Sequence, residues 1–124
     1  EFALTLPLFL LLFSAVIDFG WLFYEQSALD GAIHDGCRKG ATLDPGVNDV
    51  NMDSNKDQTR TYIRNYIGQN GITCDNCMVE VSELYSYPAT SFRCQVNNDF
   101  HSLVGLVPDM SLRGIAVVRL ELQR

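Results

Sequence analysis

The sequence predicts an α+β fold in which a long N-terminal helix carries a small head, made of a short helix and a three-stranded, mainly antiparallel sheet. Two observations support this prediction. Hydrophobic residues occupy 18 of the first 24 positions but only about 40 of the other 100. Later in the chain, apolar residues recur at every second position, which is the spacing of half-buried strands. We therefore divide the chain into residues 1–24, an apolar transmembrane or filament-core helix, and residues 25–124, the polar half of that helix with a globular α+β head.

The N-terminal segment is long enough to cross a membrane. Between residues 2 and 24 the polar side chains are Thr5, Ser14 and Asp18. A helix of this length rises by about 34 Å, which exceeds the hydrocarbon core of a bilayer. The carboxylate of Asp18 would be costly in that core, so we expect it to have a partner, to be protonated or to lie at the aqueous boundary. Pro7 removes one backbone donor and can kink or locally melt the helix.

The beginning of the chain does not have the composition of an export signal. It starts with Glu1 and has no Lys or Arg before Arg38, whereas signal peptides and signal anchors carry basic residues beside their apolar stretch. We therefore expect that a basic leader preceded Glu1 and was removed. The Glu1 carboxylate would then lie either in the headgroup region or in an assembly contact.

The helix is expected to continue to about residue 42, because the turn sequence Asp44-Pro45-Gly46 follows. Small residues recur at every fourth position in this part and form a strip along one helix face: Ala28, Ala32, Gly36 and Gly40. Another backbone can approach such a strip closely. We expect the strip to receive either the sheet of the same chain or a neighbouring copy.

The head is predicted to contain one helix and three strands. Residues 57–67 form a short helix that is capped by Asp57 or a nearby Asn, with an apolar stripe of Tyr62, Ile63, Tyr66 and Ile67. Apolar and polar residues alternate in 79–87, 92–100 and 116–122, which predicts three strands. We expect the sheet to lie on the polar half of the long helix.

The four cysteines are Cys37, Cys74, Cys77 and Cys94, and one Cys-x-x-Cys motif among them permits a disulfide, zinc or redox interpretation. Export into an oxidising compartment would favour two structural disulfides. A zinc site lacks a second closely spaced pair, and no βαβ context supports a thioredoxin-like role. We expect Cys37 to pair with Cys74 or Cys77 and the remaining cysteine of that motif to pair with Cys94.

Oxygen-bearing side chains alternate in a short polar segment, at Asp49, Asn51, Asp53, Asn55 and Asp57. Calcium prefers oxygen ligands, and the segment resembles the start of a dockerin or EF-hand-like calcium loop. Ser54 stands in place of the glycine of the turn, and Arg60 stands in place of the bidentate acid. A solvated loop followed by a helix cap is the alternative. Calcium is the one cofactor that the sequence suggests.

The rest of the sequence argues against catalysis and against nucleic-acid binding. His34 and His101 are lone histidines, and no nucleophile motif, phosphate-binding loop or metalloprotease motif occurs. A net charge of −6 and an isoelectric point near 4.6 would repel a phosphate backbone. We therefore expect a structural or binding protein, not an enzyme.

Three segments resemble the TadE-like proteins, the pilin-like subunits of tight-adherence pili. Residues 1–20, EFALTLPLFLLLFSAVIDFG, are similar to the start of this family, residues 32–41 to the Gly-x-Arg end of its long helix, and residues 112–121 to its last strand. The resemblance implies a signal sequence that a prepilin peptidase cuts. In the wider type IV pilin group, the glutamate that Glu1 matches neutralises the terminal amine of a neighbouring subunit, which would select one stagger between helices.

The resemblance therefore implies a structural subunit that polymerises through its apolar helix into an extracellular adhesive pilus, with an assembly register set by Glu1, Phe2, Pro7 and Asp18. Its partners would be further copies or other pilins, the prepilin peptidase and the pilus assembly machinery. It would reside in the bacterial inner membrane before assembly and in the filament afterwards. Two alternatives stay open: a membrane-anchored calcium-binding or adhesive module that never polymerises, and a minor pseudopilin of an assembly or initiation complex.

Overall fold

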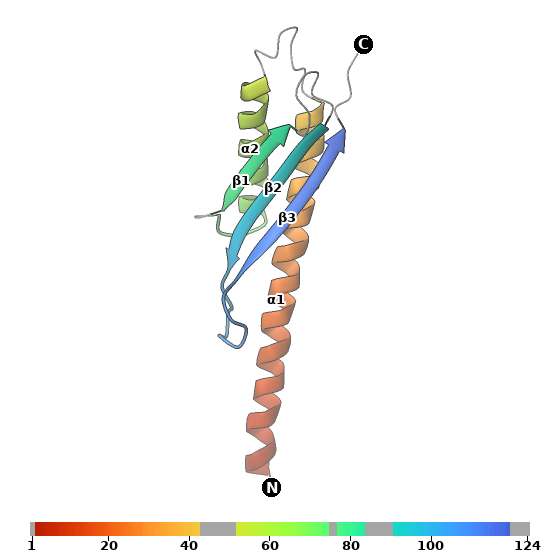
Figure 1. Ribbon diagram of the computed structural model, residues 1–124. Helices are drawn as coiled ribbons and strands as arrows, with labels where there is room; N and C mark the ends of the chain where they lie inside the picture. Colours follow the sequence, from red (N-terminus) through yellow and green to blue (C-terminus); the bar gives the residue numbers. More distant parts are fainter. Residues whose placement is uncertain (1, 43–51, 75–76, 84–90, 120–124) are drawn as a thin grey trace.

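A computed structural model describes residues 2–42, 52–74, 77–83 and 91–119. The elements in chain order are α1 (Phe2–Ala41), α2 (Met52–Gln69), β1 (Met78–Glu83), β2 (Ser91–Phe100) and β3 (Met110–Arg119). In Figure 1, the N-terminal half of α1 extends away from the head as a single rod, and its C-terminal half lies behind the sheet. The predicted α+β fold is confirmed.

The long helix α1 runs over 40 residues without a break. Pro7 lies inside it and does not end it, so the segment around Pro7 is not melted. The last turn contains Arg38 and Lys39, whose positive charges are favourable at a helix C-terminus. The Lys39 ammonium also lies 4.1 Å from the ring centroid of Tyr62 on α2. The expected stop at residues 44–46 lies outside the described residues.

The three strands form one antiparallel sheet in the order β1-β2-β3. Both helices cover the same face of this sheet, because α1 contacts β2 and β3 while α2 contacts α1 and β1. The pairing places Val81, Cys94 and Ala116 opposite one another across the three strands, and all three are buried. The core of the head therefore lies between this face and the two helices.

Alternation along β2 supplies more core residues than either of the other strands. Phe92, Cys94, Val96 and Phe100 point toward the helices and are at most 1% exposed. They meet apolar side chains that α1 and α2 contribute at helical spacing: Leu29, Ile33, Ile63 and Ile67. The strand repeats every two residues and the helix about every 3.6, and both repeats direct their apolar side chains into the same core.

The starting points of two elements differ from the prediction. The second helix begins at Met52, so Asp57 lies within it and is not its cap. The third strand begins at Met110, six residues before the predicted start. Gly114 takes an inward position between Leu112 and Ala116, and because it has no side chain the alternation is not visible there in the sequence. Part of the first predicted strand, including residues 84–87, and the end of the third, residues 120–122, lie outside the described residues.

Candidate functional site

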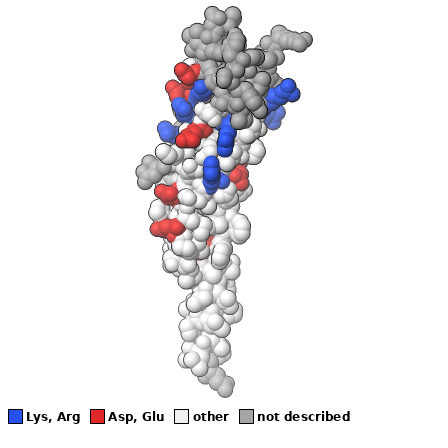
Figure 2. Space-filling model, in the orientation of Figure 1, with Lys and Arg blue, Asp and Glu red and all other residues white. Residues whose placement is uncertain are grey.

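We use the term arm for residues 2–24 of α1. Its large apolar side chains project outward; Phe2 is 87% exposed, and Leu4 through Phe13 and Val16 through Phe19 also contribute exposed apolar side chains. On the face shown in Figure 2, the charged side chains gather over the head, and the lower part of the arm shows none. The helix is long and apolar enough to cross a membrane. This surface therefore requires lipid or other apolar protein around it.

The carboxylate of Asp18 is enclosed within the chain. Asp18 is fully buried, and its two oxygens accept hydrogen bonds from the backbone amides of Val104 and Leu106 at 2.8 and 3.0 Å. Of the alternatives for this residue, the structure thus shows a partner, which is the loop 101–109 between β2 and β3. Both carboxylate oxygens are engaged within the chain, and the proposed role of Asp18 in the assembly register stays a prediction.

A second carboxylate, that of Glu25, lies on the same side of α1 two turns later. Glu25 is 8% exposed, and its Oε2 has no hydrogen-bond partner among the described residues. Burial raises the pKa of Glu25, while the side chain of Trp21 and the nearby His101 lower it to a smaller extent. Next to it, the hydroxyl of Tyr24 donates to the carbonyl of Asn70 at 2.9 Å, which ties the end of the arm to the head.

The strip of small residues on α1 receives the second helix. Gly36 and Gly40 are buried, and a Cβ atom at either position would overlap the side chain of Ile63 or Thr59, respectively. Both of these side chains belong to α2. At these two positions the strip therefore packs against α2, not against the sheet as expected. A neighbouring copy has no room at Gly36 and Gly40, because α2 already fills the space. Ala32 is also buried, and Ala28 is half-buried against the core.

The disulfides of the structure are Cys37–Cys94 and Cys74–Cys77, with Cα–Cα distances of 5.9 and 5.0 Å. The expected pairing of Cys37 with Cys74 or Cys77 is wrong. Cys37 pairs with Cys94 instead because α1 lies against β2, which brings Cys37 next to the inward-facing Cys94. The expected link between helix and sheet does exist, but Cys74 and Cys77 pair locally before β1.

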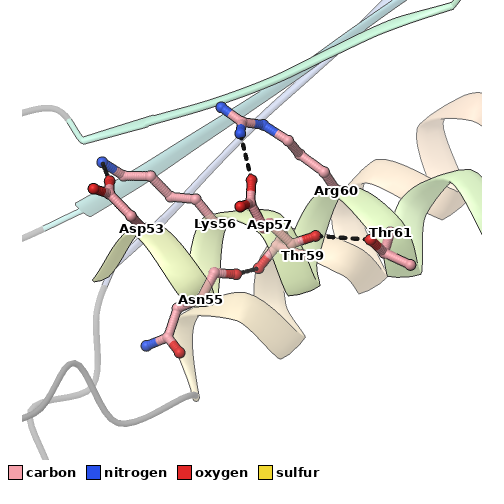
Figure 3. A network of polar contacts seen from close by, with 7 residues as sticks. All are labelled: Asp53, Asn55, Lys56, Asp57, Thr59, Arg60 and Thr61. Atoms are coloured by element: carbon pink, nitrogen blue, oxygen red, sulfur yellow. Dashed lines mark hydrogen bonds and ion pairs between the residues drawn. The ribbon is translucent and has the colours of Figure 1, made fainter. Parts of the chain in front are cut away.

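Figure 3 shows the part of the proposed calcium segment that the structure describes. Asp53, Asn55 and Asp57 lie on α2, where residues two positions apart point to different sides. Asp53 and Asp57 are four positions apart and share one side of α2, and each is paired with a base, Asp53 with Lys56 at 3.5 Å and Asp57 with Arg60 at 2.8 Å. Asp49 and Asn51 lie outside the described residues. Within the described residues, no group of three His, Cys, Asp or Glu side chains is arranged to hold a metal.

Sequence reasoning missed the loop amides that bind Asp18. Their signal was present in the segment Leu103-Val104-Gly105-Leu106-Val107, which is unusually apolar for a connection between two polar-faced strands. Gly105 adopts a φ of 86°, which a residue with a side chain rarely takes, and this turn lets the amides on either side of it face the same carboxylate. Of the other proposed register residues, Glu1 lies outside the described residues, Phe2 is exposed at the tip of the arm and Pro7 lies within α1.

Comparison with known proteins gives one match. The family model described as TadE-like protein matches residues 1–38, which confirms the resemblance of the N-terminal segment. The matched region contains the arm, Asp18, Glu25 and Cys37, and it ends before α2 and the sheet. No curated protein and no solved structure matches the chain. The match shows that the N-terminal segment is similar to TadE-like proteins, and the apolar helix suggests anchoring in a membrane.

Proposed function

Because its first 38 residues match the TadE-like family, we propose that this chain is a structural pilin-like subunit, held in the bacterial inner membrane by its arm and then polymerised into an extracellular Tad-like pilus. The observation that supports the proposal best is the arm itself. The large apolar side chains from Phe2 to Phe13 are more than half exposed, whereas Trp21 and Leu22 near the end of the arm pack against the core of the head. Such a surface is suited to a bilayer before assembly and to other arms afterwards.

Transfer of the arm from lipid to a filament core gains little from the hydrophobic effect, because lipid tails are as apolar as leucine side chains. Assembly must therefore depend on the fit between side chains. Phe9 and Phe13 form a ridge on one side of the arm, with ring centroids 5.1 Å apart and more than half of each side chain exposed. We propose that this ridge packs into the neighbouring arms of the filament.

The proposed processing and partners follow from the family. A prepilin peptidase would cut before the arm, and the assembly machinery would move the subunit into the filament. The carboxylate of Glu1 would neutralise the terminal amine of a neighbouring copy and so select one stagger between arms. With Glu1 as the charge that pairs between subunits, Asp18 can remain inside the chain, where it accepts hydrogen bonds from the loop amides. The outer surface of the head would serve adhesion.

The test is to express the chain with its pilus assembly machinery, to shear filaments from the cells and to quantify the chain in filaments and in membranes by mass spectrometry. The variant Phe9→Leu/Phe13→Leu keeps the arm apolar but changes the shape of the ridge. We expect normal membrane levels and a several-fold loss of the chain from filaments. The control Gln58→Ala changes an exposed residue of α2 and should assemble like the parent.

Other results would support a different function. If the parent chain stays in the membrane fraction while filaments form without it, the chain is an anchored module that does not polymerise. If it is present in filaments at only a small fraction of the main subunit, it is a minor pseudopilin. Equal filament levels for the parent and the ridge variant would refute packing through Phe9 and Phe13.

A further inference from the structure

The loop 101–109 presents apolar side chains to the outside of the head. Leu103, Val104 and Leu106 are 60%, 50% and 47% exposed, while Val107 turns inward and is 7% exposed. The loop lies at the end of the sheet that is nearest the arm, and it runs beside α1 (Figure 1). Its exposed side chains thus continue the apolar surface of the arm onto the head.

The hydrogen bonds to Asp18 fix the height of this loop along the arm. A hydrocarbon core of about 30 Å corresponds to about 20 helical residues, so a span that begins at Phe2 ends near residue 22. Asp18 and the loop tip bound to it therefore lie within the last turn of the span. Trp21 and Tyr24 follow, with ring centroids 5.5 Å apart, and these residue types are enriched at the membrane interface.

The same hydrogen bonds remove an obstacle to lipid contact. Backbone N–H groups without a partner are costly in an apolar environment. In this loop the amides of Val104 and Leu106 are bound to Asp18. The carboxylate itself is covered by the loop. These two amides are thus directed inward, while the side chains of Leu103, Val104 and Leu106 are exposed.

The ionisable groups of the loop stand at its two ends. His101 Nδ1 lies 3.4 Å from a carboxylate oxygen of Asp109, and both side chains are more than 70% exposed. They flank the strand ends, whereas the segment between Leu103 and Val107 carries no charge. This distribution, with an apolar tip and a charged base, matches the change from hydrocarbon to headgroups at a membrane surface.

We propose that the tip of loop 101–109 inserts into the outer interface of the membrane that holds the arm, so that the head of the unassembled subunit rests on lipid through Leu103, Val104 and Leu106. This inference rests on the proposed anchoring of the arm. It adds a second membrane contact, which sets the tilt of the head before assembly and must be withdrawn from lipid when the subunit enters a filament.

The test uses the full chain in phosphatidylethanolamine/phosphatidylglycerol vesicles. An environment-sensitive fluorescent amino acid is placed at Leu106, and in separate samples at Phe9 in the arm and at Gln58 on α2. Quenching is then measured in two sets of vesicles, one with a spin label near the headgroup and one with a spin label deep in the acyl chain. We expect the deep label to quench Phe9, and the headgroup label to quench Leu106, several-fold more strongly than either label quenches Gln58, and the quenching at Leu106 to stay constant over a tenfold dilution of protein in lipid.

Each alternative gives a distinct result. If Phe9 is quenched but Leu106 behaves like Gln58, the arm is anchored and the loop inference is overturned. If Phe9 is not quenched, the anchoring fails and the loop inference fails with it. If quenching at Leu106 grows on dilution, a second copy of the chain covers the loop, which also overturns contact with lipid as its main state. Peptide mapping of the Cys37–Cys94 disulfide in each sample verifies that the head is folded.

Discussion

The two disulfides should differ in their contribution to stability, because they close loops of very different length. Cys37 and Cys94 are separated by 57 positions and Cys74 and Cys77 by three. The loop-closure relation gives about 4 kcal/mol for the first and about 2 kcal/mol for the second at 25 °C. Cys37 and Cys94 are also fully buried, so their replacement by alanine adds the cost of a small cavity to the same side of the comparison.

The assay is urea-induced unfolding of the full chain in detergent micelles, followed by the fluorescence of Trp21, which packs against the core. Cys37→Ala/Cys94→Ala should lose at least about 2 kcal/mol more than the matched variant Cys74→Ala/Cys77→Ala. Equal losses, or a larger loss in the second variant, would refute the reasoning. Peptides that link Cys37 to Cys74 or Cys77 in the unreduced parent would refute the pairing itself.

Three further predictions concern the helices. Gly36→Ala should destabilise the head by about 1 to 3 kcal/mol because the new methyl group has no room against α2, whereas Gly31→Ala, which meets nothing within 4 Å, should stabilise it by about 0.5 to 1 kcal/mol; urea unfolding would contradict this if both changes had the same sign. Burial raises the pKa of Glu25 above its ordinary value of 4.5, so the folded state holds more protons and the parent should lose stability as the pH rises from 4.5 through the raised pKa. Glu25→Gln should abolish that slope, and stability curves of parent and variant that run parallel across this range would show the explanation to be wrong. Asp53→Asn/Asp57→Asn should leave a calorimetric calcium titration unchanged, because both carboxylates are engaged in ion pairs along α2; a loss of heat in the variant would instead assign calcium to them.

Local periodicity was enough to predict most of the fold. The apolar run and the absence of breakers predicted α1, and the alternation from Phe92 to Phe100 predicted β2 with its inward face. These features depend on the spacing of neighbouring residues, which the sequence contains. The predicted start of the third strand is too late because the inward-facing Gly114 has no apolar side chain and interrupts the alternation.

The site depended on contacts between distant residues, and these could not be read from spacing. Pairing of Cys37 with Cys94 requires α1 to pass beneath β2, and the presence of α2 at Gly36 requires the second helix to lie beside the first. The partner of Asp18 is a pair of backbone amides 86 and 88 positions away. Backbone donors are present at almost every residue, so the sequence does not indicate which of them will meet a given carboxylate.

The bond between Cys37 and Cys94 also gives the molecule a mechanical path. A pull on the arm passes from α1 directly into the central strand β2, and the chain between these cysteines, which includes α2 and β1, is bypassed. From β2 the force reaches β3 as shear across ten antiparallel residue pairs. Hydrogen bonds that are sheared together resist far more than bonds that open one after another. The arm and the outer strand would therefore stay joined under tension even if α2 were pulled away.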